Sequence, residues 1–117
     1  MAHQLQIRNI HTHSFHGCLP EEKIIGGRFT VHITFTGDFS AAIQFDQLAH
    51  AVDYVKVHQV VREEMAIPSA LIEHVAGRML RRLKSVFPDV QTVKVEVVKY
   101  NPPVNGQLGE AIFVMEE

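Results

Sequence analysis

A lysine closes an otherwise apolar stripe near the end of the chain. In the stretch "VKVEVVKY", residues 93–100, every second residue from Val93 is a valine until Lys99 takes the same strand face. Such a lysine can lay its stem on the valines and extend its amine into water. Alternatively, a partly desolvated amine has a lowered pKa and can shuttle protons. The Asn-Pro-Pro exit at 101–103 fixes the following backbone and tilts the interpretation toward the second role.

A glutamate stands at the predicted start of a helix. In "PSALIEHV", residues 68–75, Ser69 is a suitable N-cap, which places Glu73 at the end of the first turn. The unpaired N–H groups there favour a carboxylate, so a surface glutamate is the simpler interpretation. The same arrangement could also grip a flat ring that carries two adjacent N–H donors and one carbonyl. Guanine and pterin edges have this pattern.

Other candidates are weak when taken singly. Glu21 and Glu22 follow Pro20 in a loop, and Tyr54 begins a predicted helix after an aspartate. Cys18, the only cysteine, has no strongly basic sequence neighbour to lower its pKa, so an inert side chain is expected.

The eight histidines permit a metal hypothesis. His11 and His13 project from one face of a strand, and His32 could supply a third ligand for Zn²⁺. A His-x-His pair without cysteine ligands is weak support, so no metal site is predicted.

Composition narrows the class of protein. The 117 residues suit one domain, 1–117, with 46% hydrophobic and 21% charged residues. No segment approaches the length of a membrane span, and a net charge of −2 without a basic stripe argues against nucleic acid as a partner. Because one cysteine cannot form an intrachain disulfide and the first residues show no signal pattern, a cytoplasmic location is expected.

Hydrophobic periodicity predicts the order strand, strand, helix, helix, strand, strand. "RFTVHITFTGDF" alternates over four periods and follows an opening strand, "QLQIRNI", that becomes irregular through "HTHSFHG". Residues 40–53 read as a helical turn and a strap, and "CLPEEKII" reads as a loop. The predicted fold class is therefore α+β, a four-stranded antiparallel sheet with two helices on one face. Natural proteins pair, cover or blunt such open sheet edges, and self-association edge to edge into a larger barrel is one solution.

Four stretches together resemble the dihydroneopterin aldolase family. They are "FHGCLPEE", "AVDYVKV", "LIEHVAGRM" and "VVKYNPPVNG", and the similarity spans residues 5–104. The resemblance implies the ββααββ tunnelling fold, with sheets that join across subunits into a barrel. It also implies a ring of four subunits, often stacked into an octamer, with sites between subunits.

The resemblance assigns roles by position. Glu73 matches the glutamate that anchors the pterin, the backbone N–H of Ile72 faces the ring carbonyl, and Leu71 belongs to the same binding segment. Val52 matches a residue whose backbone contacts the substrate from the neighbouring subunit.

For catalysis, Lys99 resembles the family's catalytic lysine, Glu22 the glutamate near the substrate side chain, and Tyr54 the tyrosine that joins proton transfer across a subunit boundary. The implied activity is retro-aldol cleavage of 7,8-dihydroneopterin, a step of folate biosynthesis, to 6-hydroxymethyl-7,8-dihydropterin and glycolaldehyde. The substrate's own imine accepts the electrons, so neither a cofactor nor a metal is needed.

Three alternatives stay open. An epimerase on the same fold would act on dihydroneopterin or its triphosphate, for which Arg8, Lys23 and Arg28 are the available basic residues. A zinc-dependent pterin synthase would need the histidines to converge. A pterin- or purine-binding oligomer without catalysis would keep Glu73 and make Lys99 incidental.

Overall fold

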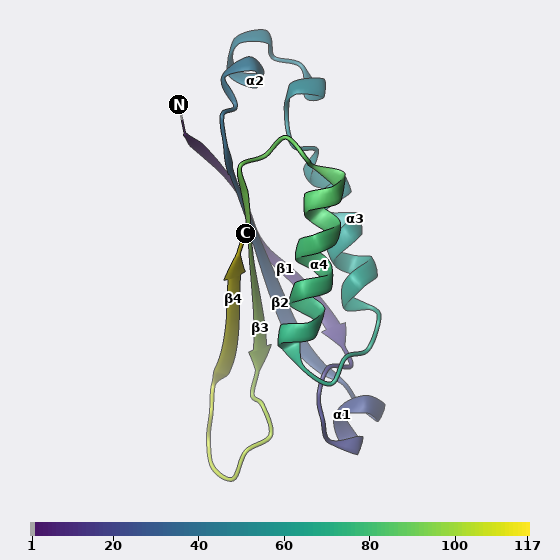
Figure 1. The fold of residues 1–117 in the computed structure, drawn as a ribbon. Coiled ribbons are helices and arrows are strands. Elements are labelled where there is room, and N and C mark those ends of the chain that lie inside the picture. The colour runs from purple at the N-terminus through teal and green to yellow at the C-terminus, as the bar shows by residue number, and fades with distance from the viewer. Residues whose placement is uncertain (1) are drawn as a thin grey trace.

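The computed structural model describes residues 2–117, in which the strands form a single four-stranded antiparallel sheet (Figure 1). The strands are β1 (His3–Ser14), β2 (Gly27–Gly37), β3 (Thr92–Tyr100) and β4 (Glu110–Glu116), and they lie in the sheet in chain order. Helices α3 (Tyr54–Met65) and α4 (Ile72–Val86) cover one face and leave the other open. The predicted α+β class and helix placement are confirmed.

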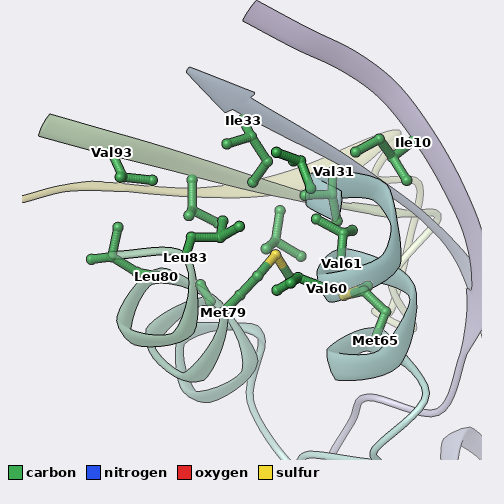
Figure 2. Packing of buried hydrophobic residues seen from close by; sticks show 14 of the residues in the cluster. Ile10, Val31, Ile33, Val60, Val61, Met65, Met79, Leu80, Leu83 and Val93 are labelled. Carbon is green, nitrogen blue, oxygen red and sulfur yellow. The ribbon is translucent and has the colours of Figure 1, made fainter. Parts of the chain in front are cut away.

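Alternation along β2 and β3 gives the sheet its apolar face. Val31 pairs with Val97 and Ile33 with Val95, and all four side chains are fully buried. From the helices, Leu83 and its neighbours pack onto this face (Figure 2). Burying each such side chain stabilises the fold by about 1.5–3 kcal/mol. The stripe of β3 is thus held in a fixed register, and that register sets the position of Lys99.

Helix α3 forms despite its β-branched residues, which lose side-chain freedom in a helix. Its buried residues are Val57, Val60, Val61 and Met65. These recur on one face, so tertiary packing supplies the stability that intrinsic propensity lacks. The Asp53 carboxylate caps the helix by accepting from the Val55 N–H at 3.0 Å.

The irregularity predicted at the end of β1 lies earlier than expected. The strand continues regularly to Ser14, and its register shifts between Ile7 and Ile10, where Asn9 has a φ of 62°. Asparagine adopts this left-handed conformation more easily than most residues. Because Ile7 and Ile10 are three apart, a bulge is needed to turn both toward the helices.

Two segments between the main elements contain short helices in addition to the predicted loop and strap. The segment predicted as a loop after residue 17 contains a short helix, α1 (Pro20–Ile24), which begins at a proline. The predicted strap contains α2 (Ser40–Phe45) and the 3-10 turn η1 (Leu48–His50), at the opposite end of the molecule from α1 (Figure 1). None of the helices within residues 2–117 combines the length and apolarity that a membrane crossing requires.

Candidate active site

Lys99 lies near the end of β3 on the face that the helices cover, between Phe29 of β2 and Ala111 of β4. Its amine donates to the Glu22 carboxylate and, at 3.1 Å, to the backbone carbonyl of His16. The side chains of Lys99 and Glu22 are only 17% and 15% exposed. The lysine is therefore held by two acceptors in a largely dry position and does not simply extend into solvent.

Helix α1 presents Glu22 to the lysine. The second carboxylate oxygen of Glu22 accepts from the Leu19 N–H at 3.4 Å, which ties the side chain to the start of its own helix. A β-carbon at Gly17 would lie 2.2 Å from the Glu22 carboxyl carbon, so a larger residue there would displace the carboxylate. Between the two candidate glutamates, Glu22 pairs with Lys99, whereas Glu21 is exposed.

The start of α4 differs from the prediction at its cap. The N-cap is Leu71 and the helix begins at Ile72, so Glu73 is its second residue. Ser69 cannot cap the helix because its backbone pairs with the segment that follows β1: its carbonyl accepts from the Gly17 N–H at 2.9 Å. The first intrahelical bonds run from residues 74 and 75 to the Leu71 carbonyl, which leaves the N–H groups of Ile72 and Glu73 ahead of the helical ladder.

One cavity joins these groups. Its volume is about 380 Å³, and Glu22, Lys99, Leu71, Ile72 and Glu73 all line it. Loop residues 17–19 and the prolines that follow β3 complete its walls. A carboxylate at a helix start and a paired amine at a strand end therefore face a common space of a size that suits a small, flat molecule.

His16 is a functional candidate that sequence reasoning missed. The residue is 1% exposed, and its Nδ1 accepts from the Ser69 N–H at 3.2 Å. Burial, assisted by the positive charges of Arg78 and Lys99, lowers the pKa of His16 to about 4, and the Met65 carbonyl offsets this only partly. The sequence places His16 directly before Gly17, in a stretch without hydrophobic periodicity. Such a position does not predict that the side chain is buried.

Tyr54 and Val52 are not brought to this cavity within one chain. Tyr54 is the first residue of α3 and is 64% exposed. Val52 is buried and lines a separate cavity of about 340 Å³ with Phe87 at the end of α4. Because α3 runs away from the strap and α4 returns from the end near α1, these residues lie at the far end of the helix pair from Glu73 (Figure 1).

Comparison with known proteins identifies the family. The family model described as dihydroneopterin aldolase matches residues 5–116. A dihydroneopterin aldolase of Staphylococcus epidermidis is 36% identical over 107 residues, which cover 90% of this chain and 88% of the relative. The chain belongs to the dihydroneopterin aldolase family. The predicted enzyme class, an aldolase and hence a lyase of folate biosynthesis, is thereby confirmed.

Solved structures of dihydroneopterin aldolases share the fold. A putative dihydroneopterin aldolase from Vibrio cholerae superimposes with a TM-score of 0.87 at 22% identity, covering 98% of this chain and 96% of that one. Dihydroneopterin aldolase of E. coli gives a TM-score of 0.85 at 19% identity, with 98% of each chain covered. At these identities the likeness establishes the fold alone.

The histidines considered for zinc do not converge in this aldolase-family chain. His11 Nδ1 contacts the Thr30 hydroxyl at 2.7 Å, and His13 Nε2 contacts the Ile25 carbonyl at 2.9 Å. His32 Nδ1 instead accepts from a backbone N–H of β1, at 3.0 Å. Within residues 2–117 no group of three or more metal-ligating side chains is assembled.

The basic residues considered for a triphosphate are dispersed. Arg8 lies 3.9 Å from Glu96, and Lys23 belongs to α1. Arg28 stacks over the Tyr100 ring at 4.3 Å and lines a neighbouring cavity of about 210 Å³, which Lys99 and Glu22 also line. The lining of the cavity that holds Glu73 includes none of these three residues of the same chain.

Proposed function

We propose that the 380 Å³ cavity binds the pterin ring of 7,8-dihydroneopterin and positions its side chain for cleavage. The Glu73 carboxylate accepts two N–H donors from the edge of the ring, while the Ile72 N–H donates to the ring carbonyl. Leu71, half exposed at the cavity wall, supplies apolar contact. The E. coli relative was solved in complex with neopterin, which supports a pterin as the ligand of this fold.

The paired amine and carboxylate supply the acid–base chemistry. The Lys99 amine passes a proton to the Glu22 carboxylate that it contacts. Acting through water, the neutral amine then takes the proton of the 2′-hydroxyl, and the bond between C1′ and C2′ breaks as the C2′ carbonyl of glycolaldehyde forms. The electron pair moves to C1′ and into the C6=N5 imine, which gives an enamine with a proton on N5. Glu22, which touches Lys99, lies where it can exchange that proton. Lys99 then returns a proton to C1′ while N5 gives its proton back to Glu22, which restores the C6=N5 imine and yields the 6-hydroxymethyl product.

The observation that carries this proposal is the cavity itself, because it brings Glu73 and the Lys99–Glu22 pair together. An assay of glycolaldehyde after incubation with 7,8-dihydroneopterin tests it. We expect product in the presence of a strong chelator, since the proposed steps use side chains alone. Tight pterin binding without product would favour the non-catalytic binder, and loss of activity with the chelator would favour a metal enzyme.

A second copy of the chain is proposed to complete the site. Tyr54 is exposed at the end of the molecule remote from Glu73, and its neighbour Val55 is 69% exposed. Strands β1 and β4 are both edges of the sheet, which leaves main-chain groups ready to pair with another subunit. Joining such edges closes a barrel, in a ring of four or two stacked rings. The Tyr54 side chain and the Val52 backbone would then reach the cavity of the adjacent subunit.

Mixed oligomers test this sharing. Tyr54→Phe and Lys99→Ala chains, each nearly inactive, are co-assembled in equal amounts. If Tyr54 acts across the boundary, random mixing restores about a quarter of the sites, because each intact site needs Lys99 from one chain and Tyr54 from the other. Activity no higher than the average of the two pure variants would show that both residues act from the same chain.

A further inference from the structure

His16 connects the two halves of the candidate site. Its backbone carbonyl accepts from the Lys99 amine at 3.1 Å, and its ring nitrogen Nδ1 accepts from the Ser69 N–H at 3.2 Å. Ser69 lies two residues before Leu71, the N-cap of α4. The adjacent Gly17 N–H donates to the Ser69 carbonyl at 2.9 Å, and His16 and Ser69 form a short parallel bridge between the segment after β1 and the segment before α4.

The ring of His16 also packs on the strand pair that carries Lys99. It meets the Phe29 ring edge-to-face, with centroids 5.0 Å apart and planes at 77°. Phe29 is in turn the cross-strand partner of Lys99. The imidazole is therefore fixed on one side by the sheet and on the other by the entry to α4.

We propose that His16 is a positioning residue of the aldolase site, which holds the Lys99 amine and the start of α4 at a fixed separation. This inference rests on the proposed function, because it assigns the amine to catalysis and the helix start to ring binding. Lys99 and Glu73 come from different elements, so their spacing depends on whatever joins those elements. Positioning of this kind matters because a displacement of about 1 Å can cost about 10²-fold in rate.

The hydrogen bond from the Ser69 N–H to Nδ1 of His16 forms only when the imidazole ring is neutral. Because Nδ1 accepts a hydrogen bond, the ring proton resides on Nε2. This nitrogen is buried and makes no hydrogen bond of ordinary geometry among residues 2–117, although the Met65 carbonyl is close enough to act on the ring. Protonation would place a donor against the Ser69 N–H. The charged groups that act on the ring are Arg78 of α4 and Lys99 of β3, and both oppose a positive imidazole. The lowered pKa of about 4 keeps the hydrogen bond intact at neutral pH.

Two amide substitutions at His16 distinguish a positioning role of its Nδ1 hydrogen bond from a role in packing alone. In His16→Asn the side-chain oxygen can occupy the place of Nδ1 and accept from the Ser69 N–H, whereas in His16→Gln the amide reaches the place of Nε2. We expect His16→Gln to lower kcat about tenfold or more and to raise KM severalfold, and His16→Asn to stay within about threefold of the wild type. His16→Leu removes the acceptor at similar volume and replaces the Gln variant should that variant not fold.

Val93→Ala is the control for stability. Val93 is fully buried near the other end of β3, so its truncation destabilises the fold without touching the cavity. We expect Val93→Ala to lower the melting temperature and leave kcat and KM unchanged at a temperature where it is folded. Parallel losses of stability and activity in all the variants, with no rescue by Asn, would overturn the positioning role.

A measurement independent of aldolase activity makes this inference separable from the proposed function. Acetylation of Lys99 by acetic anhydride, carried out on the full chain without substrate, can be followed by mass spectrometry of the peptide that contains Lys99 after digestion. We expect His16→Gln to increase the labelling rate of Lys99 severalfold, while His16→Asn and Val93→Ala match the wild type. Unchanged labelling in His16→Gln would refute the inference even if the wild type cleaves dihydroneopterin, and wild-type inactivity would refute the function alone.

Discussion

Lys99→Ala is expected to lower kcat for dihydroneopterin cleavage by about 10²–10⁴-fold and to change KM little, the range typical of losing one positioned acid–base group. The amine is held by Glu22 and His16 at one side of the cavity, whereas the groups assigned to the ring lie at the start of α4. Removing it leaves ring recognition in place. Steady-state kinetics together with pterin binding by calorimetry separate the two effects.

The matched control for this variant is Lys94→Ala. Lys94 lies on the same strand, but it pairs with Thr34 and projects from the open face of the sheet. We expect its kcat and KM to match the wild type. A Lys99→Ala enzyme that retains kcat but binds pterin weakly would reverse the assigned roles of Lys99 and Glu73.

The sheet and its helices could be predicted because each element buries one apolar stripe. The alternation of β2, with Phe29 and Phe35 at its ends, has a single consistent interpretation, and the three- and four-residue spacing of α4 has one as well. The bulge at Asn9 was also encoded, in the odd spacing of Ile7 and Ile10. It was missed because the irregular residues that follow drew the prediction toward the end of the strand.

Local rules failed where a tertiary contact replaced a local one. Ser69 has the residue type of an N-cap, yet its backbone is committed to His16 and Gly17, more than fifty residues earlier in the chain. No periodicity reports a contact of that sequence separation. The burial of His16 was invisible for the same reason.

For the candidate site, residue types and the family resemblance predicted Lys99, Glu22 and Glu73, and the structure places these three residues around one cavity. The choice between Glu21 and Glu22 depends on which helical position faces β3, and a sequence that reads as a loop cannot supply that. Tyr54 and Val52 show the opposite limit. They lie at or near the start of α3, remote from Glu73, and a role in the site requires a second chain.

Glu73→Gln is expected to weaken pterin binding by about 10²-fold, equivalent to about 2.7 kcal/mol, with a smaller effect on kcat. The substitution keeps the shape of the side chain but replaces one acceptor oxygen with an NH₂ group. That NH₂ group would face an N–H group of the ring. One hydrogen bond is therefore lost, and two hydrogen-bond donors point at each other. Calorimetric titration with neopterin measures the loss directly, without turnover.

The control for Glu73→Gln is Glu21→Gln, which changes an exposed glutamate on α1 outside the 380 Å³ cavity and should leave the dissociation constant unchanged. Both variants remove one negative charge from the same end of the molecule. The comparison therefore distinguishes the paired hydrogen bonds between the Glu73 carboxylate and the ring from general electrostatic attraction. If weakening were electrostatic, both variants would bind less tightly, and raising the salt concentration would reduce the difference from the wild type. If the Glu73 carboxylate accepts both ring donors, only Glu73→Gln binds neopterin less tightly, and the loss of affinity persists at high salt concentration. Normal neopterin affinity in Glu73→Gln would remove the carboxylate from ring recognition and leave the amides at the start of α4 as the only anchor.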